Sequence, residues 1–437
     1  MGFYSVPASQ VLSLPPTSGE ASSSTSLRKT ASLRSNDMLT FNKDFTLQEP
    51  IPQEGIDKAL GVLSTGRLHR YNTMKGEKGY AAELEEAFAA YIGSKYCLAC
   101  ASCGSALYIA LKSLGVQPGD TVLCNAYTLA PVPGAIQNAG ARIELVEIED
   151  DYTIDLDDLD AKAARTEARY LLLSHMRGHM ADMDKVMEIC RKHNLILLED
   201  CAHTMGANWN GKKSGSFGHA ACFSTQTYKH MNSGEGGLLV TDDPDVIARA
   251  IVYSGSYMLF SAHTSRPGIE AFEKIKKFTP NYSSRMDNLR AALLLPQLER
   301  LDIQCARWNE LYQHTETLLK GIPGVSCPPR NPLEYYVGSS IQFNLGNASY
   351  EQIEAFLAET GKRGVQIKWF GNKEPAGFTS SYDSWQYFEN LPDLPKTKKV
   401  LATMCDMRLP LTFTKDDCTL IVEIISEVIR DMGLDKA

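Results

Sequence analysis

From about residue 50 onward, short apolar runs alternate with segments in which apolar residues recur every three or four positions. The runs are nearly continuous, as in strands buried on both faces, and the segments between them have the period of amphipathic helices. Strands are predicted at 121–125, 142–148, 169–174, 195–199, 220–224 and 237–241, and helices at 104–114, 131–139 and 183–193. This order predicts an α/β domain whose sheet is largely parallel and covered on both faces.

The pattern changes after about residue 300. One long helix is predicted over 287–319, and the remaining chain mixes helix-like and strand-like segments. We therefore expect a large α/β domain over 41–300 and a smaller α+β domain over 301–437.

The N-terminal segment, residues 1–40, differs from the rest. It is rich in Ser, Thr and Pro, and its only acids are Glu20 and Asp37. Such a segment buries too little apolar area to offset its ordering entropy, which predicts a disordered tail. A disordered tail leaves a cytoplasmic location as the expectation. Scarcity of acids is also typical of an organelle transit peptide, so an organelle is the alternative. Gly2 does not start a myristoylation motif, because Val6 stands where Ser or Thr is required.

Composition narrows the classes of function. The 437-residue chain has a formal net charge of −8, which argues against nucleic acid as the main partner because phosphate binding needs clustered Lys and Arg. Its apolar runs are far shorter than the roughly 20 residues of a membrane-spanning helix, so no membrane is expected as a partner. Eleven cysteines without a repeating framework favour reduced, mostly buried thiols.

Two charged residues stand near the ends of predicted buried strands. Lys229 follows the strand 220–224 and precedes a Gly-rich stretch at 235–237, where backbone can approach closely. Asp200 comes directly after the strand 195–199, at the sheet edge where α/β proteins place ligands. Taken singly, they could be a surface lysine and a helix cap or loop ion pair. Together they suit pyridoxal phosphate, whose protonated ring nitrogen needs a carboxylate partner.

A Gly-Ser pair opens the helix predicted at 104–114. The free backbone N–H groups at Gly104 and Ser105 would face an anion, and Ser224, which ends a strand, could offer its hydroxyl. A Gly-Ser start alone usually means only a helix cap. The C-x2-C-x2-C run at 97–103 lacks a fourth ligand at a fitting spacing, so no metal site is expected there.

Five segments, in this order and spacing, resemble the DegT/DnrJ/StrS aminotransferases, pyridoxal-phosphate enzymes of fold type I that mostly aminate keto sugars. The resemblance covers roughly residues 50 to 430 and rests on ASCGSAL at 101–107, PGDTVLCNAYTLAPVPGAIQNAGA at 118–141, EDCAHTMGA at 199–207, FSTQTYKHMNSGEGG at 223–237 and SSRMDNLRAALLLPQLERLD at 283–302. It implies pyridoxal 5'-phosphate as cofactor and a homodimer with shared active sites. The implied reaction moves an amino group from glutamate or glutamine to a keto or aldehyde sugar-like acceptor.

The resemblance also assigns roles to single residues. Lys229 matches the Schiff-base lysine, Asp200 the partner of the pyridine nitrogen, and His203 a contact on the side of the phenolic oxygen. Gly104, Ser105 and Ser224 match phosphate contacts, and Tyr127 matches an aromatic residue that stacks on the ring. In the resembled family, an Asn two residues before an Arg-Met pair contacts the phosphate of the cofactor bound in the neighbouring subunit. Here Ser283 stands at that place and Asn281 two residues before it, so either could serve.

Candidate substrate contacts lie in the segment 174–184. Arg177 follows a predicted strand and is either a charge paired within the fold or a planar fork that grips an acidic group of the substrate. His175 keeps the pattern of the resembled family and is a second candidate. The aromatic-rich stretch 365–388 is loosely similar to the branch that aminates an eight-carbon keto-sugar acid. An acidic acceptor is therefore a hypothesis.

Two alternatives stay open. Dehydratases of the resembled family carry His in place of the lysine, whereas this chain keeps Lys229 with His230 beside it, which favours transamination. A regulator that binds pyridoxal phosphate without catalysis is the other alternative, and the intact Lys229 and Asp200 speak against it.

Overall fold

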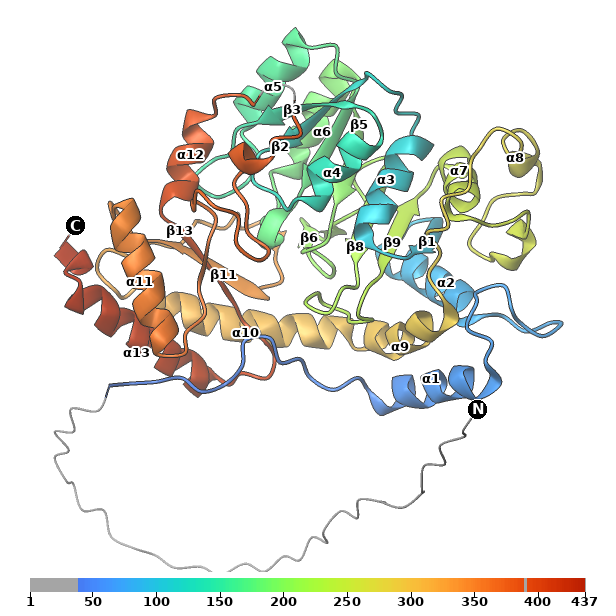
Figure 1. Cartoon of the computed structure of the whole chain (residues 1–437). Helices are drawn as coiled ribbons and strands as arrows, with labels where there is room; N and C mark the ends of the chain where they lie inside the picture. Colours follow the sequence, from blue (N-terminus) through green and yellow to red (C-terminus); the bar gives the residue numbers. More distant parts are fainter. Residues whose placement is uncertain (1–37, 389–390, 437) are drawn as a thin grey trace, which may run out of the picture. The chain divides into compact units, whose positions relative to one another are not determined.

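The computed structural model describes residues 38–388 and 391–436, and a seven-stranded sheet lies at the centre of the larger part (Figure 1). The strand order is β1-β9-β8-β5-β4-β2-β3. β9 runs antiparallel to β1 and β8 on either side of it, and all other neighbouring strands are parallel. The strands are β1 Tyr96–Cys100, β2 Thr121–Asn125, β3 Arg142–Val146, β4 Tyr170–Ser174, β5 Ile196–Asp200, β8 Ala220–Ser224 and β9 Gly237–Thr241. The predicted α/β fold with a largely parallel sheet is confirmed.

Helices cover both faces of this sheet (Figure 1). Successive strand residues enter different apolar cores: Leu171 and Leu197 pack with α2, α5, α6 and α9, whereas Leu172 and Leu198 pack with α3, α4 and α7. The helices are α1 Gln53–Thr65, α2 Tyr80–Ile92, α3 Cys103–Ser113, α4 Pro131–Asn138, α5 Leu156–Arg165, α6 Met183–His193, α7 Pro244–Ser254, α8 Glu270–Glu273 and α9 Asn288–Glu299, with short 3-10 turns η1 Met176–Gly178 and η2 Phe260–Ala262.

Local sequence explains where several of these helices begin. Ser102, Asp155, Asp182 and Asp243 precede α3, α5, α6 and α7, and each side chain accepts a backbone N–H from the first turn. Such caps satisfy donors that the helix itself leaves unpaired. The predicted helices at 104–114, 131–139 and 183–193 correspond to α3, α4 and α6.

The helical pattern over 287–319 forms two helices instead of one. α9 ends at Glu299 and α10 Leu301–Leu319 follows, with Arg300 at φ −102° and ψ 0° between them. Pro296, which has no amide hydrogen and crowds the preceding turn, lies four residues before the break. The prediction of one continuous helix is therefore wrong at this point.

The C-terminal region builds a second, antiparallel sheet of order β11-β13-β12. One face of that sheet packs with α10, α11 and α13 in a separate apolar core that includes Ile341, Phe343 and Met407. The elements are β11 Ser340–Asn344, α11 Tyr350–Lys362, β12 Lys368–Trp369, η3 Tyr382–Ser384, α12 Pro395–Ala402, β13 Met404–Arg408, α13 Lys415–Asp431 and η4 Leu434–Lys436. A small third sheet joins β10 Glu334–Tyr335, β6 Asn208–Trp209 and β7 Lys212–Lys213.

The predicted boundary near residue 41 does not coincide with a change of core. Phe41 and Phe45 pack edge to face against Phe413 inside the C-terminal core. The start of the predicted large domain, 41–300, thus packs with the region assigned to 301–437. The two-domain division otherwise stays a prediction.

Most of the predicted tail, with Gly2, lies outside the described residues. Within the part of the chain that the structure describes, no helix combines the length and the apolar character needed to span a membrane. The eleven cysteine thiols are all free and most are buried.

Candidate active site

A cavity of about 300 Å³ lies at the carboxyl ends of β5 and β8. Six of the residues singled out in the sequence line it: Gly104, Arg177, Asp200, His203, Ser224 and Lys229. The carboxyl edge of a parallel sheet is where α/β folds place ligands, because loops and helix N-termini converge there. The structure therefore brings together segments that are up to 125 residues apart in the chain, from Gly104 to Lys229.

Asp200, the last residue of β5, brings a buried carboxylate to this cavity and is only 5% exposed. Its Oδ2 accepts a hydrogen bond from Ser174 Oγ at 2.7 Å, and its Oδ1 accepts one from the Ala202 amide at 3.1 Å. Burial raises the pKa of Asp200, and the bond from Ser174 and the charge of Lys229 act in the opposite sense. A carboxylate held in this way can pair with a protonated ring nitrogen.

Lys229 faces the same cavity and contacts His203. The distance from Lys229 Nζ to His203 Nε2 is 2.9 Å. Burial, reinforced by the charge of Arg177, lowers the pKa of Lys229 to about 7, so much of the amine is neutral near neutral pH. Burial and the charge of Lys229 hold the pKa of His203 well below its usual value. A neutral His203 can accept an N–H from Lys229, which orients an amine able to attack an aldehyde or take up a proton.

The start of α3 forms an anion cradle beside these groups. Ser102 Oγ accepts the Ser105 amide at 3.0 Å, and the cavity is lined here by Gly104 and by Ser224 from the end of β8. Gly237 packs on the backbone of Ser102, where an added Cβ would lie 2.5 Å from the Ser102 carbonyl carbon and oxygen. A helix N-terminus with a nearby hydroxyl suits a phosphate.

The residues present fit pyridoxal 5'-phosphate. Asp200 would hold the ring nitrogen, Lys229 the aldehyde carbon, and the start of α3 with Ser224 the phosphate. This donor set combines a buried carboxylate, an amine of lowered pKa and a cradle in which a Cβ at Gly237 has no room.

We predict that Gly237→Ala weakens both the fold and the affinity for pyridoxal phosphate. Forcing Ser102 away costs about 1–3 kcal/mol of unfolding free energy, as in other overpacked sites. Chemical denaturation and titration of the cofactor into apoenzyme measure the two effects. Gly134→Ala is the matched control, because it lies in the nearby α4 and an added Cβ meets nothing within 4 Å. Equal behaviour of the two variants would contradict the cradle.

Tyr127 is not brought to the cavity. It is 1% exposed, its ring lies 5.1 Å from that of Phe370, and its hydroxyl is 3.8 Å from Met404 Sδ. Leu129, two residues further on, lines the cavity instead. The structure thus does not support the expected stacking contact, because the loop after β2 turns Tyr127 into a packed apolar cluster.

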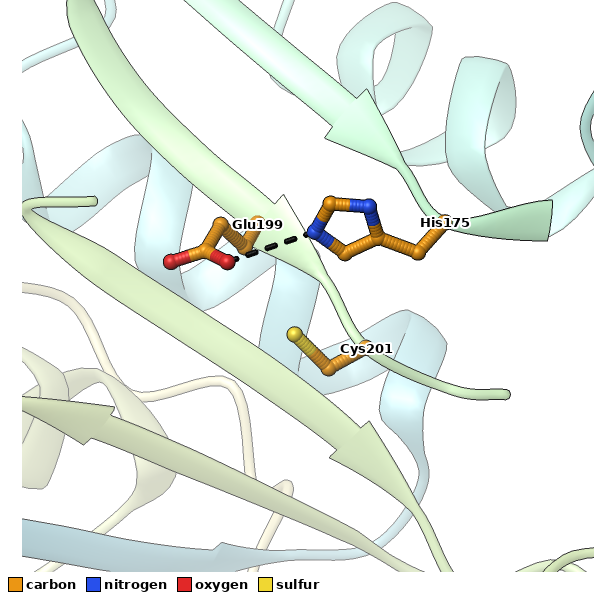
Figure 2. Close-up of side chains that lie close together, drawn as sticks. All are labelled: His175, Glu199 and Cys201. Atoms are coloured by element: carbon orange, nitrogen blue, oxygen red, sulfur yellow. Dashed lines mark hydrogen bonds and ion pairs between the residues drawn. The ribbon is translucent and has the colours of Figure 1, made fainter. Parts of the chain in front are cut away.

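His175 does not line the cavity and points toward Glu199 of β5 (Figure 2). Its Nε2 is 3.3 Å from Glu199 Oε2, and consecutive residues Glu199 and Asp200 point to opposite faces of the strand. Glu199 also accepts three backbone N–H groups, from residues 215, 217 and 218, at 2.8–3.0 Å. The expected substrate role of His175 is therefore not supported.

Figure 2 also shows Cys201 beside His175 and Glu199. One ligand atom from each residue lies within 4.8 Å of the others, as a metal site would require. The carboxylate of Glu199 is already committed to three amides and to His175, so we interpret this group as a structural link between β5 and the loop at 215–218.

Arg177 lines the cavity, and its charge is matched within the fold. It adopts φ +55° in η1, and its guanidinium lies 2.8 Å from Asp406 Oδ2 of β13. Of the two interpretations left open by the sequence, the ion pair within the fold is the one that the structure contains.

Ser105, Asn281 and Ser283 do not line the cavity. The amide of Ser105 is occupied by Ser102. Asn281 and Ser283 lie on an exposed segment, where Asn281 Oδ1 accepts the Ser283 amide at 2.9 Å. Their expected contact with the phosphate of a second subunit stays a prediction.

Sequence reasoning missed two lining residues that carry chemistry. Arg408 ends β13, and Tyr228 directly precedes Lys229. Polar and apolar residues alternate in SIQFN at 340–344 and in MCDMR at 404–408, which places the polar residues on one face of each strand. This alternation is the sequence signal that could have identified Arg408.

Known proteins resemble this chain in sequence and in fold. A model of the DegT/DnrJ/EryC1/StrS aminotransferase family matches residues 62–426. The chain is 28% identical over 386 residues to the spore coat polysaccharide biosynthesis protein SpsC of Bacillus subtilis, covering 87% of this chain and 95% of that protein. It is 37% identical over 224 residues to the GDP-perosamine synthase of Caulobacter vibrioides, covering 51% and 57%.

A third relative is the L-glutamine:scyllo-inosose aminotransferase of Streptomyces griseus, 35% identical over 268 residues, or 60% of this chain and 62% of that protein. Among solved structures, 3-amino-5-hydroxybenzoic acid synthase aligns with a TM-score of 0.76 and 23% identity, over 90% of this chain and 100% of its own, which shows the shared fold. The chain therefore belongs to the DegT/DnrJ/EryC1/StrS family of pyridoxal-phosphate-dependent aminotransferases.

Proposed function

We propose that this enzyme transfers the amino group of glutamate or glutamine to the keto or aldehyde carbon of a sugar-like acceptor. The observation that carries the proposal is the convergence of Lys229, His203 and Asp200 on one cavity, beside a cradle suited to phosphate. The named activities of the perosamine and scyllo-inosose relatives support a sugar-like acceptor, and the latter supports glutamine as a donor.

When bound, pyridoxal phosphate supplies an aldehyde that exchanges amino groups and a ring that accepts electrons. In the proposed reaction Asp200 keeps a proton on the ring nitrogen, which strengthens that electron withdrawal. Lys229 would hold the aldehyde end of the cofactor. Its Nζ, once free, would carry the proton released at the donor Cα, with His203 fixing the direction of the amine.

A homodimer with shared sites is part of the proposal. Asn281 and Ser283 are exposed on the surface of the chain, as residues that serve a neighbouring subunit would be. The exposed side chains of Tyr257, Met258 and Phe278 supply apolar area on nearby segments.

The function is tested by adding amino donors to the purified enzyme loaded with pyridoxal phosphate. We expect L-glutamate or L-glutamine to bleach the cofactor's visible absorbance and to release the matching 2-oxo acid in equal amount, and a keto-sugar acceptor to restore the colour. Acceptors are then found by screening keto sugars with labelled donor. Colour that no amino donor bleaches would contradict amino transfer and favour another reaction or a regulatory role.

A further inference from the structure

The second sheet presents a polar face on the side opposite its apolar core. Residues alternate along its strands, so Ile341, Phe343, Trp369, Cys405 and Met407 pack in the core. The alternate positions are Ser340, Gln342, Lys368, Asp406 and Arg408, and the register places Lys368 and Gln342 on either side of Asp406. Arg408, on this face, lines the active-site cavity.

Asp406 is the carboxylate on this polar face. Asp406 Oδ1 accepts a hydrogen bond from Gln342 Nε2 at 2.8 Å, and its Oδ2 lies 2.8 Å from Arg177. In the described part of the chain, neither Arg408 nor Lys368 comes within 4.0 Å of a carboxylate oxygen. The Nζ of Lys368 is buried without a hydrogen-bond partner.

The charges on this face are therefore unbalanced. Three cations, Arg177, Lys368 and Arg408, stand around Asp406, which can neutralise one of them. Burial, with the charge of Arg177, lowers the pKa of Lys368 to about 8 and also lowers that of Arg408. Burying positive charge without a partner is costly, and a bound anion would remove that cost.

Two aromatic rings flank these cations. The guanidinium of Arg408 lies 3.7 Å from the ring centre of Tyr228, and Lys368 Nζ lies 5.5 Å from that of Phe378. Both rings line the cavity, and Phe378 is 56% exposed, so this is the side open to solvent. A ring face attracts a cation without occupying its N–H donors as a carboxylate would, so these donors remain available to a ligand.

We propose that Arg408 and Lys368 form a binding site for a carboxylate of the substrate. The proposal rests on the proposed function, because Arg408 lines the cavity beside Lys229 and Lys368 lies next to Phe378, which also lines it. Arg177, the residue that the sequence offered for this task, is already neutralised by Asp406. The carboxylate belongs either to the acceptor or to the amino donor, and the experiment separates these sources.

The test compares binding to the cofactor-loaded wild type, Arg408→Gln and Lys368→Gln. Calorimetric titration with D-glucuronate and with D-glucose probes the acceptor side, since the two sugars differ in one carboxylate. The L-glutamate concentration that half-bleaches the cofactor probes the donor side. We expect each substitution to weaken binding of the carboxylated probe about 10-fold or more, the effect of losing a charge-assisted hydrogen bond. Glucose binding should not change.

Two further variants make the outcome specific. Lys373→Gln removes one positive charge from an exposed position five residues beyond Lys368, outside the cavity, and should change neither measurement. Arg408→Lys keeps the charge and should recover most of the binding. If Arg408→Gln fails to fold, as judged by circular dichroism, Lys368→Gln carries the same test.

The outcomes are distinct. A change for glucuronate alone assigns the site to the acceptor, and a change for glutamate alone assigns it to the donor; both support a carboxylate site. Unchanged binding of both probes in both variants would overturn it. The two proposals can also fail separately. If glutamate does not bleach the cofactor of the wild type, but glucuronate binding still depends on Arg408, the proposed amino transfer is contradicted and the proposed carboxylate site is supported.

Discussion

Lys229→Ala is expected to lower amino transfer by at least about 10⁴-fold, because in the proposed reaction this one side chain both holds the cofactor and moves the proton. Turnover with glutamate and a keto-sugar acceptor measures the loss. The absorbance of the bound cofactor should also shift, since no lysine amine can attach to the aldehyde. A variant that transaminates at the wild-type rate would refute the assignment.

The same variant should remain folded. Burial lowers the pKa of Lys229 from 10.5 to about 7, so between these values the unfolded chain binds more protons than the folded one. Wild-type stability therefore rises with pH across that window, and this contribution disappears in Lys229→Ala. The variant's melting temperature near neutral pH should not fall below that of the wild type. Lys185→Ala, at a side chain that is 66% exposed, is the control for loss of a surface lysine.

Asp200→Asn is expected to lower the rate about 10²–10³-fold while the cofactor still binds. The amide oxygen can still accept a hydrogen bond from Ser174 or Ala202, but the negative charge that is proposed to keep the ring nitrogen protonated is lost. Single-turnover bleaching by glutamate isolates the affected step.

The control for this substitution is Asp393→Asn, whose carboxylate is 80% exposed and pairs with Lys398 on the surface. It should keep the wild-type rate. Equal rates for wild type and Asp200→Asn would show that the carboxylate does not act on the reaction, whatever its position in the cavity.

The sequence predicted the central sheet well because strands buried on both faces are recognisable as apolar runs. β8 and β9 coincide with the predicted ranges, and Asp200 could be placed because it ends a strand. Lys229, five residues beyond β8, was singled out by the Gly-rich stretch that follows it and by the resemblance. The edge at which parallel strands end is shared, so residues far apart in the chain could be placed together without knowing any loop.

The roles predicted for Tyr127 and His175 are not supported by the structure, for a different reason. Each lies one or two residues beyond a strand, where the path of the loop decides which way a side chain points. His175 and Arg177 are separated by one residue, yet one pairs with Glu199 behind the sheet and the other faces the cavity with φ +55°. No apolar periodicity encodes such a turn.

Arg408 illustrates the remaining gap. Its contact with Tyr228 joins a strand of the second sheet to the loop after β8, 180 residues earlier in the chain, and no local pattern links the two positions. The alternation along β13 gives the face on which Arg408 lies, but only the packing of the second sheet against the cavity shows what that face meets.

Glu199 and Asp200, adjacent acids at the end of β5, limit which insertions and deletions this strand can accept. Glu199 faces the amides at 215–218 and Asp200 faces the cavity, so a slip of one position along β4 and β8 would exchange them. A single deletion or insertion within 194–199 would keep a sheet of the same strands while presenting the wrong acid to the ring. A change of length in this strand would therefore remove two groups at once, the acid proposed for the ring nitrogen and the link between β5 and the loop at 215–218.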